Sequence, residues 1–99
     1  MNAVFISPAL AEMAEAAEFY ESQQAGLGHQ FLEAIDRAVD DIEKHPRRWL
    51  ILKKQVRRRL VGRFPYGILY RIGEEGRQEI TIIAIMHLHR RPNYWTKRI

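Results

Sequence analysis

The sequence predicts an α+β domain with the element order β-α-α-β-β-β, in which a helical hairpin packs on one face of a mainly antiparallel four-stranded sheet. Apolar residues recur at helical spacing through the first half of the chain and at alternating spacing in the second half. A short connector with two glycines separates the two helical segments. A chain of 99 residues forms one domain, which we expect to span residues 1–99.

The first half begins with an apolar segment, residues 3–6, which predicts a short strand. Ser7 and Pro8 then indicate a helix start, because a serine hydroxyl can cap a free amide and proline fits the first helical turn. Residues 9–24 are good helix formers. Four glutamates lie outside the apolar stripe of this helix: Glu12, Glu15, Glu18 and Glu21. We expect them on a solvated face, with contact to a target protein as the alternative.

A second helix follows Gly26 and Gly28 and ends at His45 and Pro46. Five apolar residues at helical spacing form its buried stripe: Phe31, Ile35, Ala38, Val39 and Ile42. The short connector makes the two helices an antiparallel hairpin. We expect this hairpin to cover one face of the sheet and to leave the other face, with its arginines, open to a partner.

The second half predicts three strands, at residues 56–61, 66–72 and 80–86, with a hairpin turn at 73–76. Residues 80–86 are almost all apolar, which is typical of a central strand. Tyr66 and Tyr70 alternate with other residues on one strand, so we expect them in the core. Trp49 precedes these strands, and we expect it to anchor the loop after the second helix.

Charge is distributed very unevenly along the chain. Residues 1–45 hold nine acidic and two basic residues, a net charge of −7, whereas residues 46–99 hold three acidic and fourteen basic residues, a net charge of +11. Such asymmetry favours binding of anionic partners and speeds their encounter. The densest basic run contains Lys53, Lys54, residues 57–59 and Arg63. Phosphate groups and an acidic protein segment are equally suitable partners for it, and a solvated edge strand is the purely structural alternative.

The composition excludes several classes of function. The chain has no cysteine, so disulfides, thiol catalysis and cysteine-bound metal are excluded. His87 and His89 are two residues apart, but two ligands are not a metal site, so we expect neither metal nor cofactor. The apolar runs are too short to span a bilayer and no signal peptide is evident, so we expect a cytoplasmic protein.

Two stretches, residues 63–72 and 82–87, carry a resemblance to a known family. The first contains Phe-Pro-Tyr followed by an alternating strand with Tyr-Arg. The second is Ile-Ile-Ala-Ile-Met-His, followed by Arg-Arg-Pro at 90–92 and Tyr-Trp at 94–95. With the predicted element order, the chain resembles toxins of the RelE/ParE superfamily of bacterial type II toxin–antitoxin modules, and within it the ParE-like, plasmid-stabilisation type.

The resemblance implies two alternative activities and one shared partner, a cognate antitoxin with which the chain forms a hetero-oligomer. ParE-like members bind DNA gyrase and are not enzymes, whereas RelE-like members enter the ribosome and cut mRNA. The Phe-Pro-Tyr and Arg-Arg-Pro phrases are closer to the ParE branch. Gly67 stands where several nucleases have arginine, and no glutamate lies between Pro46 and Arg63. We therefore favour a gyrase-binding toxin, with the nuclease or a degenerate antitoxin-binding member as alternatives.

The two activities imply different site residues. Metal-independent RNA cleavage needs an acid and a base with pKa values near neutrality and cations beside the phosphate. The candidates for a nuclease are His87, His89, Arg63 and Tyr94, with the two histidines on one face of a strand. The candidates for binding a target or an antitoxin are Arg57, Arg58, Arg59, Arg63, Arg90, Arg91 and Trp95.

Overall fold

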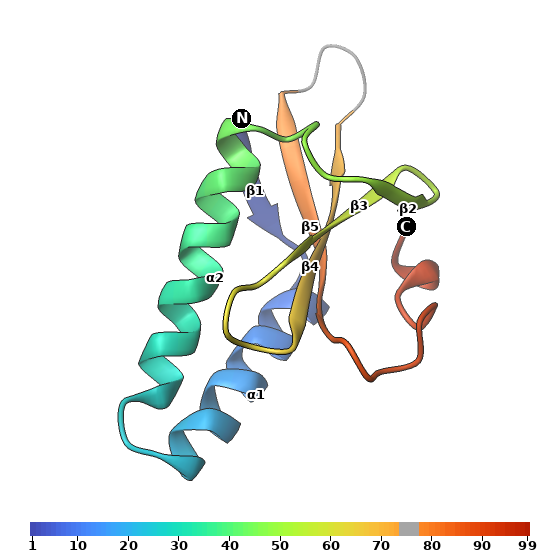
Figure 1. Ribbon diagram of the computed structural model, residues 1–99. Coiled ribbons are helices and arrows are strands. Elements are labelled where there is room, and N and C mark those ends of the chain that lie inside the picture. The colour runs from blue at the N-terminus through green and yellow to red at the C-terminus, as the bar shows by residue number, and fades with distance from the viewer. Residues whose placement is uncertain (74–77) are drawn as a thin grey trace.

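The computed structural model describes residues 1–73 and 78–99, which form one five-stranded sheet, two long helices and a C-terminal segment (Figure 1). The elements in chain order are β1 (Asn2–Phe5), α1 (Ser7–Gln23), α2 (Leu27–Lys44), β2 (Ile51–Lys53), β3 (Val56–Leu60), β4 (Tyr66–Ile72), β5 (Glu79–His87) and a 3-10 turn η1 (Thr96–Arg98). The predicted α+β class and the order of the elements are confirmed.

The sheet has the strand order β1-β5-β4-β3-β2. β1 lies parallel to β5, and the other neighbours are antiparallel. The predicted count of four strands is corrected to five by β2, which pairs with β3 as an edge strand. β2 has only three residues and no alternation of apolar and polar side chains, so its pattern gave no strand signal. The predicted turn at 73–76 lies, apart from Gly73, outside the described residues.

The helical hairpin depends on its glycines. Gly26 precedes α2 with φ +87°, a left-handed conformation that suits glycine. Gly28 lies so close to α1 that a Cβ atom there would be 2.5 Å from the carbonyl oxygen of Ala17. The start of α1 differs from the prediction, because Ile6 occupies the capping position and no side chain caps the helix. Glu21 instead caps α2, since its carboxylate accepts the N–H groups of Gly26 and Gly28.

The helices cover one face of the sheet. Phe31, Ile35 and Ile42 of α2 pack there against Ile68 and Tyr70 of β4. The phenol of Tyr70 donates to the carbonyl of Pro46, 2.6 Å away, so a buried polar group is satisfied. As predicted, Tyr70 is fully buried, and Tyr66 packs against the same core.

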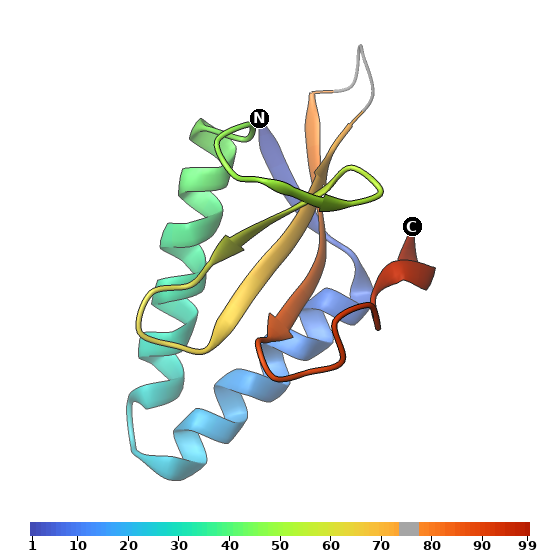
Figure 2. The same cartoon turned by 45° about the vertical axis from the view of Figure 1, so that its right-hand side comes forward.

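The other face of the sheet is not open, contrary to the prediction. The chain after β5 turns back across this face, so that the sheet lies between the helices and the C-terminal segment (Figure 1). Figure 2 turns the sheet toward the viewer, with both helices behind it. Trp95 of this segment is 1% exposed. It belongs to a second core cluster with Val56, Leu69, Ile83, Ala84 and Met86, against which Tyr94 and Ile99 pack.

A bulge in β5 determines which side chains reach each face. Leu69 pairs with Ala84 and Tyr70 with Ile82, so Ile83 is an extra residue in the strand. Ile83 and Ala84 therefore both contribute to the second cluster, and Ile85 returns to the helix-covered side. The same shift places His87, two residues beyond Ile85, against Tyr66 on that side, with ring centroids 5.1 Å apart. Among the described residues, neither helix is long and apolar enough to cross a membrane.

Candidate functional site

The most densely connected group of polar side chains is centred on Glu12 of α1. Its side chain is only 10% exposed. One carboxylate oxygen accepts the backbone N–H of Ile85 at 3.0 Å, and the other accepts the phenol of Tyr94 at 2.7 Å. The residues that meet here are 73 and 82 positions apart in the sequence. Glu12 thus joins α1, β5 and the C-terminal segment, and is not on the solvated face that its position in the helix indicated.

Two arginines complete this Glu12 cluster. Arg98 places its Nη1 2.9 Å and its Nη2 3.0 Å from the two carboxylate oxygens, a bidentate ion pair. Arg90 donates to the same carboxylate at 3.1 Å. A single buried carboxylate therefore faces two guanidinium groups, and the hydrogen bonds of Glu12 offset the cost of removing its charge from water.

The geometry of the sheet explains why a hydrogen-bond acceptor is needed at this position. β1 pairs with β5 only as far as Phe5 and Ile82, so this edge of β5 has no strand partner beyond that point among the residues that the structure describes. An unpaired backbone group removed from water costs free energy unless another group bonds to it. Glu12 accepts the N–H of Ile85, and Arg98 donates to the carbonyl of Ile83 at 3.0 Å. Beyond the end of β1, the side chains of Glu12 and Arg98 thus supply the hydrogen-bond partners that a neighbouring strand would give to β5.

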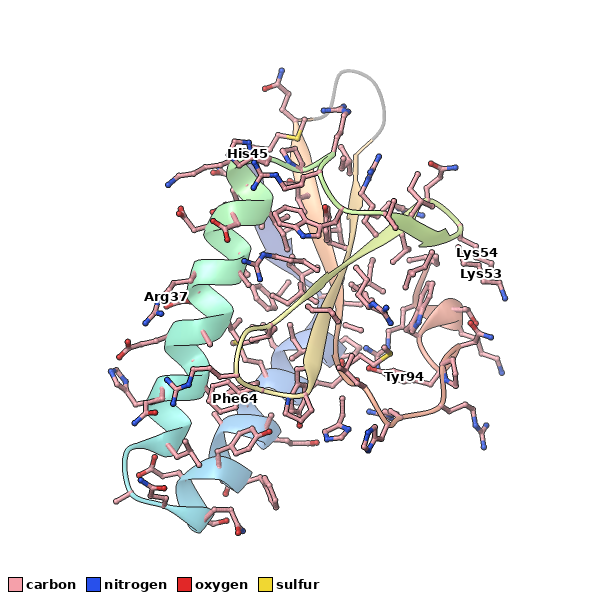
Figure 3. All side chains as sticks on the ribbon, viewed as in Figure 1. Arg37, His45, Lys53, Lys54, Phe64 and Tyr94 are labelled. Carbon is pink, nitrogen blue, oxygen red and sulfur yellow. The ribbon has the colours of Figure 1, made fainter. Side chains whose placement is uncertain are left out.

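Tyr94 lies between the two arginines. The guanidinium carbons of Arg90 and Arg98 are 3.8 and 4.9 Å from the centre of its ring. Burial, and next the hydrogen bond to the negative Glu12, raise the pKa of the Tyr94 phenol well above its usual value of 10.0. Tyr94 is therefore a hydrogen-bond donor at neutral pH and cannot serve there as a base. Figure 3 shows Tyr94 on the C-terminal segment, across the sheet from Arg37 of α2.

The two histidines lie beside this cluster. His87 lines a hollow of about 160 Å³ together with Glu15, Phe19, Tyr66 and Arg90. β5 ends at His87, so His89 is in the following turn and not on the same strand face as predicted. The two rings nevertheless lie 5.3 Å apart, because the backbone N–H of His89 donates to Nδ1 of His87 at 3.1 Å.

The run of three arginines in β3 is divided between the two faces of the sheet. Arg57 and Arg59 pair with Tyr70 and Ile68, and so lie on the helix-covered side, whereas Arg58 pairs with Leu69 on the other side. Arg57 donates to the carbonyls of Arg47 and Trp49. These contacts hold the loop after α2. Arg57 therefore helps to fix the position of Trp49, the residue predicted to anchor this loop.

Arg59 is also engaged within the molecule. It forms an ion pair with Asp41 of α2 and stacks on Trp49, with 5.2 Å from its guanidinium carbon to the ring centre. The prediction grouped the three arginines on one partner-facing surface. Only Arg58 lies on the face opposite the helices, because successive side chains of a strand point in opposite directions.

Three other predicted residues are distributed over the molecule. Arg63 donates to the side chain of Gln30 at 3.0 Å and lines a hollow beside α2, not the hollow that His87 lines. Arg91 is exposed, after the end of β5. Trp95 is buried in the second core cluster and donates to the carbonyl of Pro92 at 2.9 Å. The structure therefore brings together His87, His89, Arg90 and Tyr94, and separates them from Arg63 and from Arg57 and Arg59 of β3. Arg58 of β3, in contrast, lines a hollow of about 300 Å³ together with Arg90 and Trp95.

Glu12 was not among the predicted site residues. Nothing in the sequence signalled its role, because the spacing of the four glutamates on α1 does not distinguish Glu12 from the other three. The described residues also contain no group of three His, Cys, Asp or Glu side chains able to hold a metal ion.

The comparisons with known proteins agree with this architecture. The family model for the ParE toxin of the type II toxin-antitoxin system, parDE, matches residues 4–92. The chain belongs to the ParE toxin family. Among solved structures, a chain from the chromosomal ParDE TA system from P. aeruginosa has a similar fold, with a TM-score of 0.65 and 17% sequence identity over 90% of this chain and 97% of that chain. None of the curated proteins matches the sequence.

Proposed function

We propose that this ParE-family chain inhibits bacterial growth by binding DNA gyrase, without enzymatic activity of its own, and that a cognate antitoxin neutralises it. The family match supports the type of module. The choice of a binding protein over a nuclease rests on one observation. Glu12 engages Arg90 and Tyr94, the side chains grouped with the histidines that an RNA-cleaving site would use, and it also binds Arg98.

RNA cleavage without metal needs a base for the 2′-hydroxyl, an acid for the leaving oxygen and cations for the charged phosphorane. The raised pKa of Tyr94 removes it as a base at neutral pH. The single charge of Glu12 offsets one of the two positive charges of Arg90 and Arg98, and Arg63 lies in a different hollow. Among the described cations, the hollow of His87 therefore has only Arg90, which is already bound to Glu12, to orient a phosphate.

The residues proposed to contact gyrase or the antitoxin are the basic side chains that the fold leaves available. Arg91 is exposed, and Arg58 lies half-buried on the face opposite the helices. Arg90 keeps 51% of its side chain exposed while it contacts Glu12. Arg57 and Arg59 hold the loop and α2, so we assign them a structural role. An acidic surface on the partner matches the remaining set.

The test in cells follows incorporation of labelled thymidine and labelled amino acids in the minutes after the chain is induced in bacteria. We expect thymidine incorporation to stop first while translation continues. An earlier collapse of protein synthesis would support the ribosome-dependent nuclease instead. If neither rate falls while the folded chain accumulates, the degenerate, antitoxin-binding alternative is correct in that host.

A second experiment addresses the target directly. Purified chain is added to DNA gyrase, and loss of supercoiling is measured beside a variant with His87→Ala and His89→Ala. We expect equal inhibition by both proteins, because the proposed activity does not use the imidazoles. Arg91→Ala is the matched basic variant and should weaken inhibition. A folded histidine variant that loses toxicity in cells, with gyrase unaffected by either protein, would contradict the proposal.

A further inference from the structure

The most exposed group of large apolar side chains in the described molecule lies at the sheet edge formed by β2, the residue before it and the end of β3. Leu50 is 82% exposed, Leu52 45% and Leu60 52%. These three leucines line one hollow of about 410 Å³ with Trp49, Arg58 and Arg59. We call this the β2-edge surface. Ile51, in the middle of β2, is 46% exposed beside it. Clustered exposed apolar residues of this kind mark an interaction site more often than isolated ones do.

The backbone at this surface is also available. β2 is the last strand in the sheet order and pairs only with β3, so its outer edge has no strand partner among the described residues. Such an edge can bind an extended segment of another chain through main-chain hydrogen bonds. Natural edge strands usually carry charges that prevent this pairing. Here the charges lie at the tip, at Lys53 and Lys54 (Figure 3). The leucines remain exposed.

The charge around the surface decides what kind of partner fits. The sequence contains no acidic residue between Lys44 and Gly73, and this span includes nine basic residues. Arg58 lines the β2-edge surface, Arg48 lies over the ring of Trp49, and Lys53 and Lys54 are at the end of β2. None of these four forms an ion pair with an acid that the structure describes. A second copy of the chain pairing edge to edge would bring these like charges together. An acidic segment would instead be attracted.

We propose that the β2-edge surface binds an extended segment of a partner protein in which apolar residues alternate with acidic ones. The segment adds a sixth strand beside β2. Because successive side chains of a strand alternate between faces, its apolar residues enter the leucine hollow while its acidic residues meet the surrounding arginines and lysines. Leu52 and Arg58 also line a neighbouring hollow with Arg90, so this surface adjoins the Glu12 cluster. The inference does not depend on the cellular target of the toxin.

The test uses the full-length ¹⁵N-labelled chain and a synthetic eight-residue probe of alternating leucine and glutamate, blocked at both ends. The control peptide has lysine in place of glutamate. We expect amide shifts and slowed hydrogen exchange centred on residues 50–53 and 60, and binding of the glutamate peptide at least about tenfold tighter than that of the lysine peptide at low salt. Equal affinities of the two peptides would overturn the proposal.

Matched variants separate this surface from other apolar patches. The double variant Leu50→Ser and Leu52→Ser removes two exposed side chains, so its fold should persist, and it should weaken binding by at least about tenfold. Leu10→Ser, on α1 with 46% exposure, should leave binding unchanged. Shifts centred on α1, or equal loss in both variants, would contradict the assignment. Sedimentation of the chain without peptide is expected to give a monomer, whereas a dimer that the double variant abolishes would identify a second copy as the occupant.

Discussion

The carboxylate of Glu12 accepts the backbone N–H of Ile85 at 3.0 Å, although the two residues are 73 positions apart in the sequence. This contact marks the point where β1 ends and a side chain takes over the edge of β5. Through Tyr94 and Arg98 the same carboxylate holds the C-terminal segment against the sheet. One residue of α1 therefore positions the covering of the face that the helices leave open.

Replacing Glu12 with glutamine should destabilise the protein strongly. The amide keeps the shape but loses the charge, so Arg98 remains largely buried without its counter-ion, and we expect a loss of about 3–5 kcal/mol in the free energy of unfolding. Urea denaturation followed by tryptophan fluorescence measures it. Glu18→Gln, an exposed position on the same helix, is the control and should cost less than about 0.5 kcal/mol. Equal stability of the two variants would show that the Glu12 cluster contributes nothing to folding.

Tyr94 should make the protein less stable in alkali. Its pKa is raised in the folded state, so its contribution is complete below the unfolded value of 10.0 and is lost as the pH rises through the folded value. The free energy of unfolding should therefore fall with pH above about 10. Tyr94→Phe removes the titrating phenol and should make this fall less steep.

The other tyrosines with raised pKa values provide the control for Tyr94. Burial also raises the pKa values of Tyr20, Tyr66 and Tyr70, so some alkaline slope should persist in Tyr94→Phe. Absorbance at high pH should show Tyr94 as the phenol that ionises only with unfolding. An unchanged slope in Tyr94→Phe would mean that its phenol titrates equally in the folded and unfolded chain.

The turn between β2 and β3 should be easy to stabilise. Lys54 and Gln55 have φ values of 51° and 64°, left-handed conformations that cost side-chain-bearing residues free energy. A two-residue hairpin of this geometry favours Asn-Gly. The double substitution Lys54→Asn and Gln55→Gly should add about 1 kcal/mol to the free energy of unfolding, measured by urea denaturation. Lys53→Gly, a residue of β2 itself, should instead destabilise; a gain from both changes would exclude backbone strain as the cause.

Capture of the antitoxin should depend on salt through its association rate. Exposed basic residues steer an acidic partner, so raising the salt concentration should slow association more than it changes dissociation. In surface-binding kinetics, Arg91→Ala should reduce the association rate a few-fold and flatten its salt dependence. Arg37→Ala is the matched control, because Arg37 pairs with Glu33 on α2, in the acidic half of the chain. A rate independent of salt would contradict electrostatic steering.

Much of the fold follows from local patterns. The apolar stripe of α2, from Phe31 to Ile42, and the alternation from Tyr66 to Ile72 each point to one element and one buried face. The candidate site was harder to predict from the sequence. The histidines and Tyr94 could be selected as candidates from the chemistry of their side chains. Their separation from Arg63 could not be predicted from spacing, because it depends on the loop that carries Arg63 and on its contact with Gln30.

The prediction for the β3 arginines was right about their charge and wrong about their lying on one common face. Three consecutive cations indicate a basic surface, yet strand geometry sends Arg57 and Arg59 to the helix side, where Asp41 and the loop carbonyls receive them. The alternation of the β3 side chains between the two faces of the sheet could be predicted from the sequence. The presence of acceptors on the helix side was not, because it depends on how α2 lies across the sheet.

The sequence by itself determined the class and order of the elements, the helical hairpin and the charge asymmetry, because these depend on neighbouring residues and on composition. Only the tertiary structure decided that the C-terminal segment covers the second face, that Ile83 is bulged, and that Glu12 is buried among arginines. Each of these depends on contacts between residues far apart in the chain. Such contacts are determined by the packing and hydrogen bonding of the whole fold, so local sequence patterns do not predict them.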